Sequence, residues 1–365
     1  MPKPISDQVI VITGASSGIG LMTARDAARR GARVVLAARN ENDLESAVHE
    51  IRSEGGEAIA VPTDVADLAQ VEALAQRAID EYGRIDTWVN NAAAAIYGTF
   101  REVPLEDFKR AVDVNFHGQV HGARAALPHL EKTAGALICV GSALSDRGLP
   151  LQGAYSASKH ALKGWLDSLR VELRHEGSPV RVTLVKPSSI NTPLFDKART
   201  YMGVQPMPFP PVYEPELVAE GILRAAEGNL RDLFIGGSGK VLSLVERVSP
   251  RLVDAAQQRT AFRKQQTDLP KGRDAENNLE APVAQDGGLR GKFARNPTRR
   301  SPYHAMAVHP VVASWIGASA MTVGAALLRN RDDRTLSVLL GIGATMLAGR
   351  ALLAIARDHA LGEAT

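Results

Sequence analysis

Cysteine is nearly absent from this 365-residue sequence, in which Cys139 is the only one. A single thiol excludes any disulfide within the chain and any zinc site built from several cysteines, as is typical of a reducing compartment. Residues 1–7 also lack the apolar stretch and the small-residue cleavage site of a secretory signal. We therefore expect a cytoplasmic protein and predict no metal site.

A large charge excess is lacking as well, because 43 Lys and Arg residues face 40 Asp and Glu residues. The net charge of +3 is too small for a nucleic-acid footprint spread over the surface, so no nucleic-acid partner is expected. Residues 262–303 carry nine basic and five acidic side chains and account for the whole positive excess. The basic isoelectric point therefore describes this segment and not the folded body.

Short apolar runs alternate with helix-length segments through the first 255 residues. The first run ends at a glycine and is followed by a helical pattern at 19–30. Such alternation predicts parallel βαβ units, and the crossover rule favours a doubly wound Rossmann fold with a seven-stranded parallel sheet. The seven predicted strands are 8–13, 33–37, 58–61, 85–90, 136–140, 180–185 and 233–235.

The amino-acid composition changes after this α/β domain, which we assign to residues 1–255. Residues 256–303 are polar and basic and predict a linker or a loosely packed strap. Residues 304–365 predict an apolar helical hairpin, since 305–328 contain no charged residue. A helix of that length could cross a bilayer, whereas its many small residues also suit a soluble hairpin or an oligomerisation element.

A glycine-rich loop, TGASSGIG at 13–20, lies between the first predicted strand and the first predicted helix. Glycines at that place allow a tight turn and bring backbone N–H groups close to a pyrophosphate. A glycine pattern alone can also be purely structural, but its position directly after a strand favours phosphate binding.

This loop resembles the TGxxxGxG signature of the short-chain dehydrogenase/reductase family. Further motifs of that family follow in order: NNA at 90–92, a serine at 142 and YSASK at 155–159. The resemblance covers about 250 residues and implies nicotinamide-dependent hydride transfer on CH–OH or C=O groups. The catalytic residues that it implies are Asn115, Ser142, Tyr155 and Lys159.

The spacing of Tyr155 and Lys159 supports this chemistry independently of the resemblance. Residues four apart on a helix share one face, and a positive charge nearby would make the tyrosine a better acid or base near pH 7. Ser142 could donate a hydrogen bond to the substrate oxygen where charge changes. The role of Asn115, holding a proton-relay water behind the lysine, is implied by the resemblance alone.

The end of the second predicted strand bears on cofactor choice. An NAD site needs a carboxylate there, but Ala38 stands at that position and Arg39 follows it. A guanidinium can pair with a 2′-phosphate, so we predict NADP(H) in preference to NAD(H), the alternative being a solvated arginine at a helix start. The resemblance implies a cofactor site made of Thr13, Gly14, Ser16, Ser17, Gly18, Ile19, Gly20, Arg39, Asp64, Val65, Asn91, Ala92, Tyr155, Lys159, Pro187, Ile190 and Thr192.

Two positions depart from the family pattern. Ala93 and Ser188 replace glycines of the NNAG and PGxxxT motifs, which affects local geometry and not the catalytic set. Asp64 fits either an adenine contact or a helix cap, and the two readings are compatible.

The substrate is expected to be a small apolar carbonyl or alcohol. Residues 192–213 are rich in proline and large apolar side chains and predict an apolar lid, although an apolar loop at a subunit interface fits equally well. Tyr97, Leu144, Arg147 and Leu149 are predicted as further walls of the site.

The leading prediction is thus an NADP(H)-dependent reductase or dehydrogenase. The alternative is a low-turnover nucleotide-sensing or membrane-scaffolding protein that retains the fold. Membrane association through 304–356 and a homo-oligomer are further expectations. All predicted chemical groups precede residue 261, so a chain shortened there is expected to stay soluble and active.

Overall fold

The computed structural model describes residues 2–284, 287–292, 297–299, 301 and 303. The chain divides into two units, Met1–Arg299 and Arg300–Thr365, and the fold below is that of the described residues of the first. The helical hairpin expected at 304–365, with its membrane association, lies outside the described residues and stays a prediction. Among the described residues, none of the helices has the length and apolar character needed to cross a bilayer.

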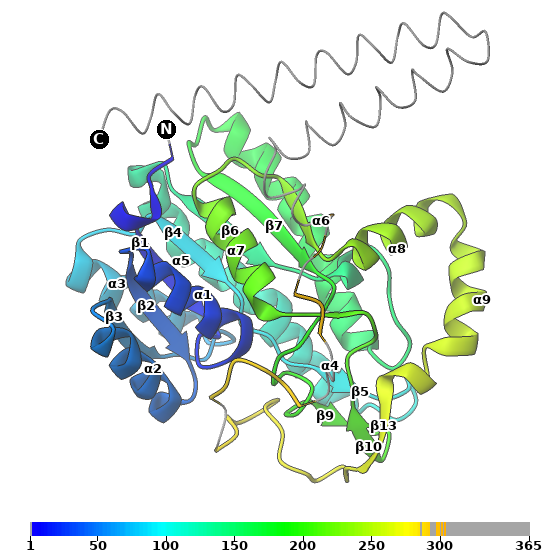
Figure 1. Cartoon of the computed structure of the whole chain (residues 1–365). Coiled ribbons are helices and arrows are strands. Elements are labelled where there is room, and N and C mark those ends of the chain that lie inside the picture. The colour runs from blue at the N-terminus through cyan, green and yellow to red at the C-terminus, as the bar shows by residue number, and fades with distance from the viewer. Residues whose placement is uncertain (1, 285–286, 293–296, 300, 302, 304–365) are drawn as a thin grey trace, which may run out of the picture. The chain divides into compact units, whose positions relative to one another are not determined.

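A seven-stranded parallel sheet forms the centre of the first unit, in the order β12-β7-β6-β4-β1-β2-β3 (Figure 1). All five residues of β1 are buried, as expected for a strand covered by helices on both faces. This confirms the predicted doubly wound fold. The strands are β1 (Val9–Thr13), β2 (Arg33–Ala38), β3 (Glu57–Pro62), β4 (Thr87–Asn90), β6 (Ala136–Val140), β7 (Arg181–Pro187) and β12 (Asp232–Ile235).

Helices cover both faces of the sheet. Helix α1 packs with α2 and α7, whereas α3 packs with α5 and α4 with α6. Capping defines some of the ends: Asp67 accepts hydrogen bonds at the start of α3, and Gly83 ends that helix in the left-handed region. The helices are α1 (Gly18–Arg29), α2 (Glu41–Ser53), α3 (Leu68–Tyr82), α4 (Leu105–Val112), α5 (Gly118–Thr133), α6 (Gly153–His175), α7 (Pro215–Ala226), α8 (Gly237–Val248) and α9 (Pro250–Thr260).

The chain switches direction across the sheet between β1 and β4. Because β3 lies at one edge, the chain must return past β1 to form β4 on its other side. Ligands of doubly wound sheets bind outside the carboxyl ends of the strands at such a point. The topology therefore places a binding crevice beside the glycine loop after β1.

Three short strand pairs order the segment predicted as an apolar lid. Strand β9 (Arg199–Thr200) pairs with β5 (Ile96–Tyr97), and β11 (Val212–Tyr213) pairs with β8 (Ser189–Ile190). Strand β10 (Val204–Pro206) pairs antiparallel with β13 (Gln266–Pro270), which belongs to the segment expected as a linker. The lid segment is thus tied to the body at several places.

The described part of residues 256–303 fits the strap rather than the linker, the two alternatives that its composition left open. Helix α9 continues through the boundary expected at 255, and Gln265 and Leu279 are fully buried. We call residues 266–284 and 287–292 the strap. Few of its side chains are apolar, and several of its backbone carbonyls accept hydrogen bonds from the body, which a reading of hydropathy does not detect. Lys271 and Arg290 add side-chain contacts, to backbone carbonyls and to Glu214 respectively.

Candidate active site

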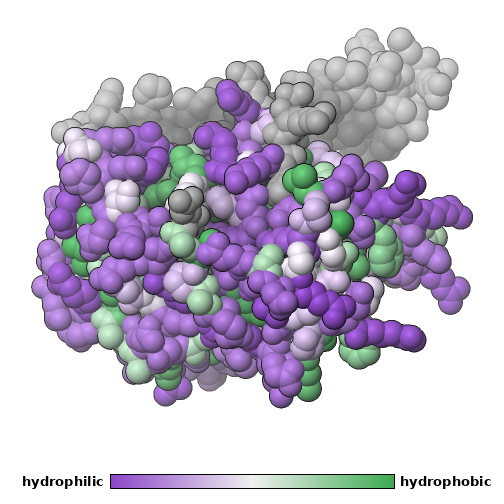
Figure 2. All heavy atoms as spheres, turned by 90° about the horizontal axis from the view of Figure 1, so that it is seen from below, coloured by the Kyte–Doolittle hydropathy of each residue, from purple (hydrophilic) through white to green (hydrophobic). Residues whose placement is uncertain are grey.

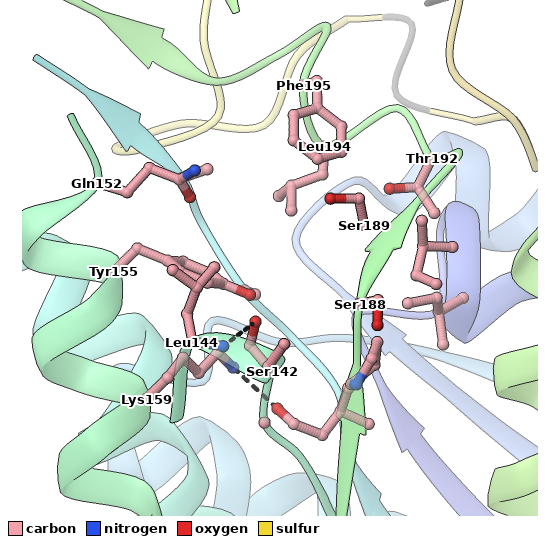
Figure 3. Close-up of a pocket in the computed structure, with 18 of the residues that line it drawn as sticks. Ser142, Leu144, Gln152, Tyr155, Lys159, Ser188, Ser189, Thr192, Leu194 and Phe195 are labelled. Atoms are coloured by element: carbon pink, nitrogen blue, oxygen red, sulfur yellow. Dashed lines mark hydrogen bonds between the residues drawn. The ribbon is translucent and has the colours of Figure 1, made fainter. Parts of the chain in front are cut away.

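A cavity of about 740 Å³ opens at the carboxyl ends of the central strands. Figure 3 shows part of it, with Tyr155 and Lys159 reaching in from α6 and Ser188 and Thr192 on the opposite wall. Its lining runs from the glycine loop and Arg39, past Ser142, to apolar residues of α8 and α9. A cavity of this size and varied lining suits a cofactor together with a substrate.

The glycine loop has the conformation that its glycines predict. Gly14 and Gly18 have positive φ values of +67° and +55°, which side chains disfavour. A Cβ added to Gly20 would lie 2.2 Å from the carbonyl oxygen of Gly14, so the first turn of α1 can approach the loop only without a side chain there. The loop therefore presents the N-terminal end of α1 to the cavity, where helices hold phosphates.

Thr13 and Asn91 join the ends of β1 and β4. The hydroxyl of Thr13 accepts hydrogen bonds from the backbone N–H groups of Asn91 (3.0 Å) and Ala92 (3.2 Å). The Asn91 side chain donates to the carbonyl of Thr13 at 2.9 Å. Thr13 and Gly20 do not line the cavity themselves, but they hold the loops after β1 and β4 that do. The other predicted cofactor residues line the cavity: Gly14, Ser16, Ser17, Gly18, Ile19, Arg39, Asp64, Val65, Asn91, Ala92, Tyr155, Lys159, Pro187, Ile190 and Thr192.

Arg39 lies at the cavity wall and also anchors the strap. Its guanidinium donates to the carbonyl oxygens of Asn278, Leu279 (3.2 Å) and Glu280 (2.9 Å). Asn40 adds a hydrogen bond of 3.0 Å to the carbonyl of Val283. The strap consequently runs along the part of the cavity where Arg39 was predicted to select the cofactor.

Asp64 lies beside Arg39 and is held in an ion pair. Burial alone would raise the pKa of Asp64, but the Arg110 guanidinium at 2.6 Å and a hydrogen bond from the backbone of Ala66 keep that pKa below its usual value. The cap of α3 is Asp67 and not Asp64. Asp64 lines the cavity, and its contact with the adenine of a cofactor stays a prediction.

Ser142, Tyr155 and Lys159 come together in the middle of the cavity. Ser142 begins the short turn Ala143–Ser145 after β6 and accepts a hydrogen bond from the N–H of Leu144 at 3.1 Å (Figure 3). Lys159, one helical turn after Tyr155, donates to the carbonyl of Val140 at 2.8 Å. Its ammonium nitrogen lies 5.5 Å from the centroid of the Tyr155 ring.

Burial dominates the acid–base properties of this cluster. It raises the pKa of Tyr155 to about 12, against the opposing effect of a hydrogen bond with Ser142. Burial also lowers the pKa of Lys159 to about 8. The sequence suggested that Lys159 makes Tyr155 more acidic, whereas in this structure burial of the phenol outweighs such an effect. Near neutral pH the tyrosine is protonated and the lysine is mostly charged, which suits proton donation.

Asn115 lies behind the cavity, in a π-helical turn at Asp113–His117 between α4 and α5. Its amide donates to the carbonyl of Ala94 at 2.9 Å and accepts from the N–H of Ala94 at 2.8 Å. Asn115 is fully buried and holds the loop that follows the NNA motif. Single-turn π-helices are frequent at functional sites, but no sequence pattern predicted this one.

The apolar end of the cavity contains most of the predicted walls. Tyr97, Leu144, Leu149, Leu194, Phe195 and Phe209 all line it. Arg147 does not, because its guanidinium forms ion pairs with Glu246 at 3.0 Å and with Asp254. The prediction of Arg147 as a wall is therefore wrong, and this residue instead joins the loop after β6 to α8 and α9.

Sequence reasoning missed several residues of the site. Lys197 lines the cavity and donates to the hydroxyl of Ser17 at 2.8 Å, and burial lowers its pKa to about 8. Ser188 was singled out only as a departure from the family glycine; its hydroxyl accepts from the N–H of Gly239 at 3.0 Å and thereby positions α8. The apolar wall from α8 and α9 was also missed, although its helical spacing was a usable signal: Val241, Leu242, Val245, Leu252, Val253 and Ala256.

Among the described residues, no three His, Cys, Asp or Glu side chains are grouped so that they could bind a metal ion.

Comparisons with known proteins agree with this geometry. Residues 8–202 match the family described as short chain dehydrogenase. The uncharacterized oxidoreductase YxnA of Bacillus subtilis (strain 168) is 42% identical over 332 residues, covering 89% of this chain and 92% of its own. The ketoacyl reductase HetN of Nostoc sp. is 29% identical over 261 residues, covering 68% of this chain and 88% of its own.

A solved structure shares the fold. The alcohol dehydrogenase of the archaeon Thermococcus sibiricus, complexed with 5-hydroxy-NADP, superimposes with a TM-score of 0.56 at 27% identity. The match covers 62% of this chain and 95% of that one. The chain belongs to the short-chain dehydrogenase family and is an oxidoreductase of that family.

Proposed function

We propose that this short-chain dehydrogenase transfers a hydride between NADP(H) and an apolar carbonyl or alcohol, with Tyr155 as general acid and base. One observation carries the proposal: a single cavity joins the glycine loop and Arg39 to Ser142, Tyr155 and Lys159, and ends in an apolar pocket. A nicotinamide cofactor, when bound, supplies or accepts the hydride.

The residues present fit such a cofactor. Gly14 and Gly18 have backbone conformations that side chains would strain, and the N-terminal end of α1 lies at the same place, where the N–H of Gly18 donates to the strap carbonyl of Gly288 at 2.8 Å. Lys197 adds a positive charge beside Ser17. These groups would hold the phosphates, and Asp64 and Val65 would face the adenine end of the site.

In the direction of reduction, the Tyr155 hydroxyl donates a proton to the carbonyl oxygen as that oxygen gains negative charge. The Ser142 hydroxyl donates a hydrogen bond to the same oxygen. The charge of Lys159 then favours the phenolate that remains on Tyr155. Asn115 supports the loop beside this cluster and would position a relay water.

Reduction is expected to slow as the pH rises through about 8, where Lys159 loses its charge. Below that pH Lys159 is charged and Tyr155 is protonated, and reduction requires both forms. The measurement is kcat/KM for reduction from about pH 6 to about pH 10. A profile that stays flat to pH 10 would contradict the role given to Lys159.

Arg39 is proposed to give the preference for NADP(H). Three of its N–H groups bind strap carbonyls, so within the described residues two of the five are left to meet a 2′-phosphate. Replacing Arg39 by Ala should narrow the preference for NADPH over NADH by about 10- to 100-fold, as expected for losing a charge-assisted hydrogen bond. Dissociation constants measured by fluorescence titration test this.

Arg110 provides the matched control, because it also anchors the strap but does not line the cavity. Its guanidinium donates to the carbonyl of Leu279 at 3.2 Å. The Arg110→Ala variant should weaken the binding of NADPH and of NADH by the same factor. Equal affinity of the unchanged chain for NADPH and NADH would overturn the proposed preference.

The alternative, a nucleotide sensor or membrane scaffold with little turnover, has no chemical need for this cluster. Ser142, Tyr155 and Lys159 are all placed at one cavity that also has room for a substrate. Oxidation of NADPH in the presence of a panel of apolar ketones distinguishes the two functions. Cofactor binding without turnover across the panel would favour the sensor.

A further inference from the structure

Helix α8 leaves an apolar stripe exposed on the surface. Val241, Leu244, Val245 and Val248 recur every three or four residues, and Leu252 extends the stripe onto α9. Val248 is 86% exposed and Leu252 is 62% exposed. In Figure 1, α8 and α9 lie at the right-hand edge of the described body. The face in Figure 2 is mostly hydrophilic, with hydrophobic residues scattered over it. A stripe of this kind indicates a surface that binds something apolar.

The stripe is continuous with the proposed substrate cavity. Val241, Val245 and Leu252 are exposed to solvent and also line the cavity. The exposed face and the apolar wall of the pocket therefore meet at these three side chains. Whatever covers this face also covers an entrance to the pocket.

Positive charge predominates in the segment that carries the stripe. Residues 237–264 carry six basic side chains and two acidic ones. Both acids, Glu246 and Asp254, are bound by Arg147, so the carboxylates of these two helices are already paired. The exposed cations of this segment are Arg247, Arg251, Arg259, Arg263 and Lys264. An apolar face carried by a segment with a net positive charge is complementary to the surface of an anionic lipid bilayer.

We propose that the surface formed by α8 and α9 docks on anionic lipid membranes, with the apolar stripe in the interface and the basic residues among the headgroups. The docking rests on the stripe and its charges alone. Its consequence, that apolar substrate passes from the bilayer directly into the cavity, rests on the proposed function.

The test uses the full chain and a fluorophore at a single site. Cys139 is fully buried, and burial raises the pKa of its thiol to about 12, so a Val248→Cys variant offers one reactive thiol. Bimane attached there should shift to the blue when phosphatidylglycerol vesicles are added. Phosphatidylcholine vesicles should give a much smaller shift. Val171→Cys is the matched control, since Val171 on α6 is also an exposed valine and should give no shift.

Charge reversal tests the role of the basic residues. Adding Arg247→Glu and Arg251→Glu to the labelled Val248→Cys chain should raise the vesicle concentration needed for half of the bimane shift by about tenfold or more. No shift at position 248, or equal shifts at 248 and 171, would overturn the proposal. A shift that needs only a higher protein concentration would overturn it in favour of a second copy of the chain. None of these fluorescence measurements requires turnover, so they still test membrane docking if the proposed reaction is wrong.

Discussion

Replacing Tyr155 by Phe is expected to lower turnover by about 100-fold or more, while NADPH binds nearly as well as to the unchanged chain. The change removes the only atom of the residue that can give a proton to substrate, and it keeps the ring that packs in the cavity. Burial holds the pKa of Tyr155 at about 12, so the group that is lost is a protonated phenol. Steady-state kinetics and a cofactor titration on one preparation measure both effects.

Tyr97 provides a control within the same cavity. It is also a buried tyrosine that lines the pocket, and burial likewise raises its pKa. Because Tyr97 has no assigned proton to transfer, Tyr97→Phe should change turnover much less than Tyr155→Phe. Near-normal turnover of the Tyr155 variant would rule out its role as acid and base.

Sequence reasoning located well the loop after β1, Ser142 after β6 and the Tyr155–Lys159 pair on α6. The family resemblance pointed to these residues, and their places after strands or four apart on a helix supported it. Parallel strands bring their carboxyl ends to one edge of the sheet, so local patterns are enough to predict that these residues meet. The prediction rested on the hydropathy of the strands for the fold and on the order of the family motifs for the site.

Residues that depend on distant partners could not be predicted in this way. Arg147 was expected to face the substrate, but two carboxylates about 100 positions later bind it. Part of the anchoring of the strap comes from its backbone carbonyls, which every residue possesses, so composition does not reveal that part. The apolar spacing of α8 was visible, yet only the fold shows that it meets the cavity.

A chain ending at Ala261 is expected to lose cofactor binding and to unfold about 5 to 15 °C below the full chain. Sequence alone placed the whole catalytic domain before that point, but the structure gives later residues a part in it. Gln152 donates to the side chain of Gln265 at 2.6 Å, and Gln265 donates to the carbonyl of Pro150 at 3.0 Å. Shortening the chain there also removes the strap carbonyls from Arg39.

The matched control is a chain ending at Arg299, the last residue of the first compact unit. It keeps β13, Gln265 and Leu279, and should bind NADPH and melt close to the full chain. A single change, Leu279→Ala in the full chain, should reproduce part of the loss, because Leu279 is fully buried and its removal leaves a cavity costing about 2 to 5 kcal/mol. Circular-dichroism melts and NADPH titrations compare the stability and cofactor affinity of the full chain, the two shortened chains and the Leu279→Ala variant. If the chain ending at Ala261 melts and binds NADPH like the one ending at Arg299, the strap is dispensable and the domain ends where its hydropathy indicated.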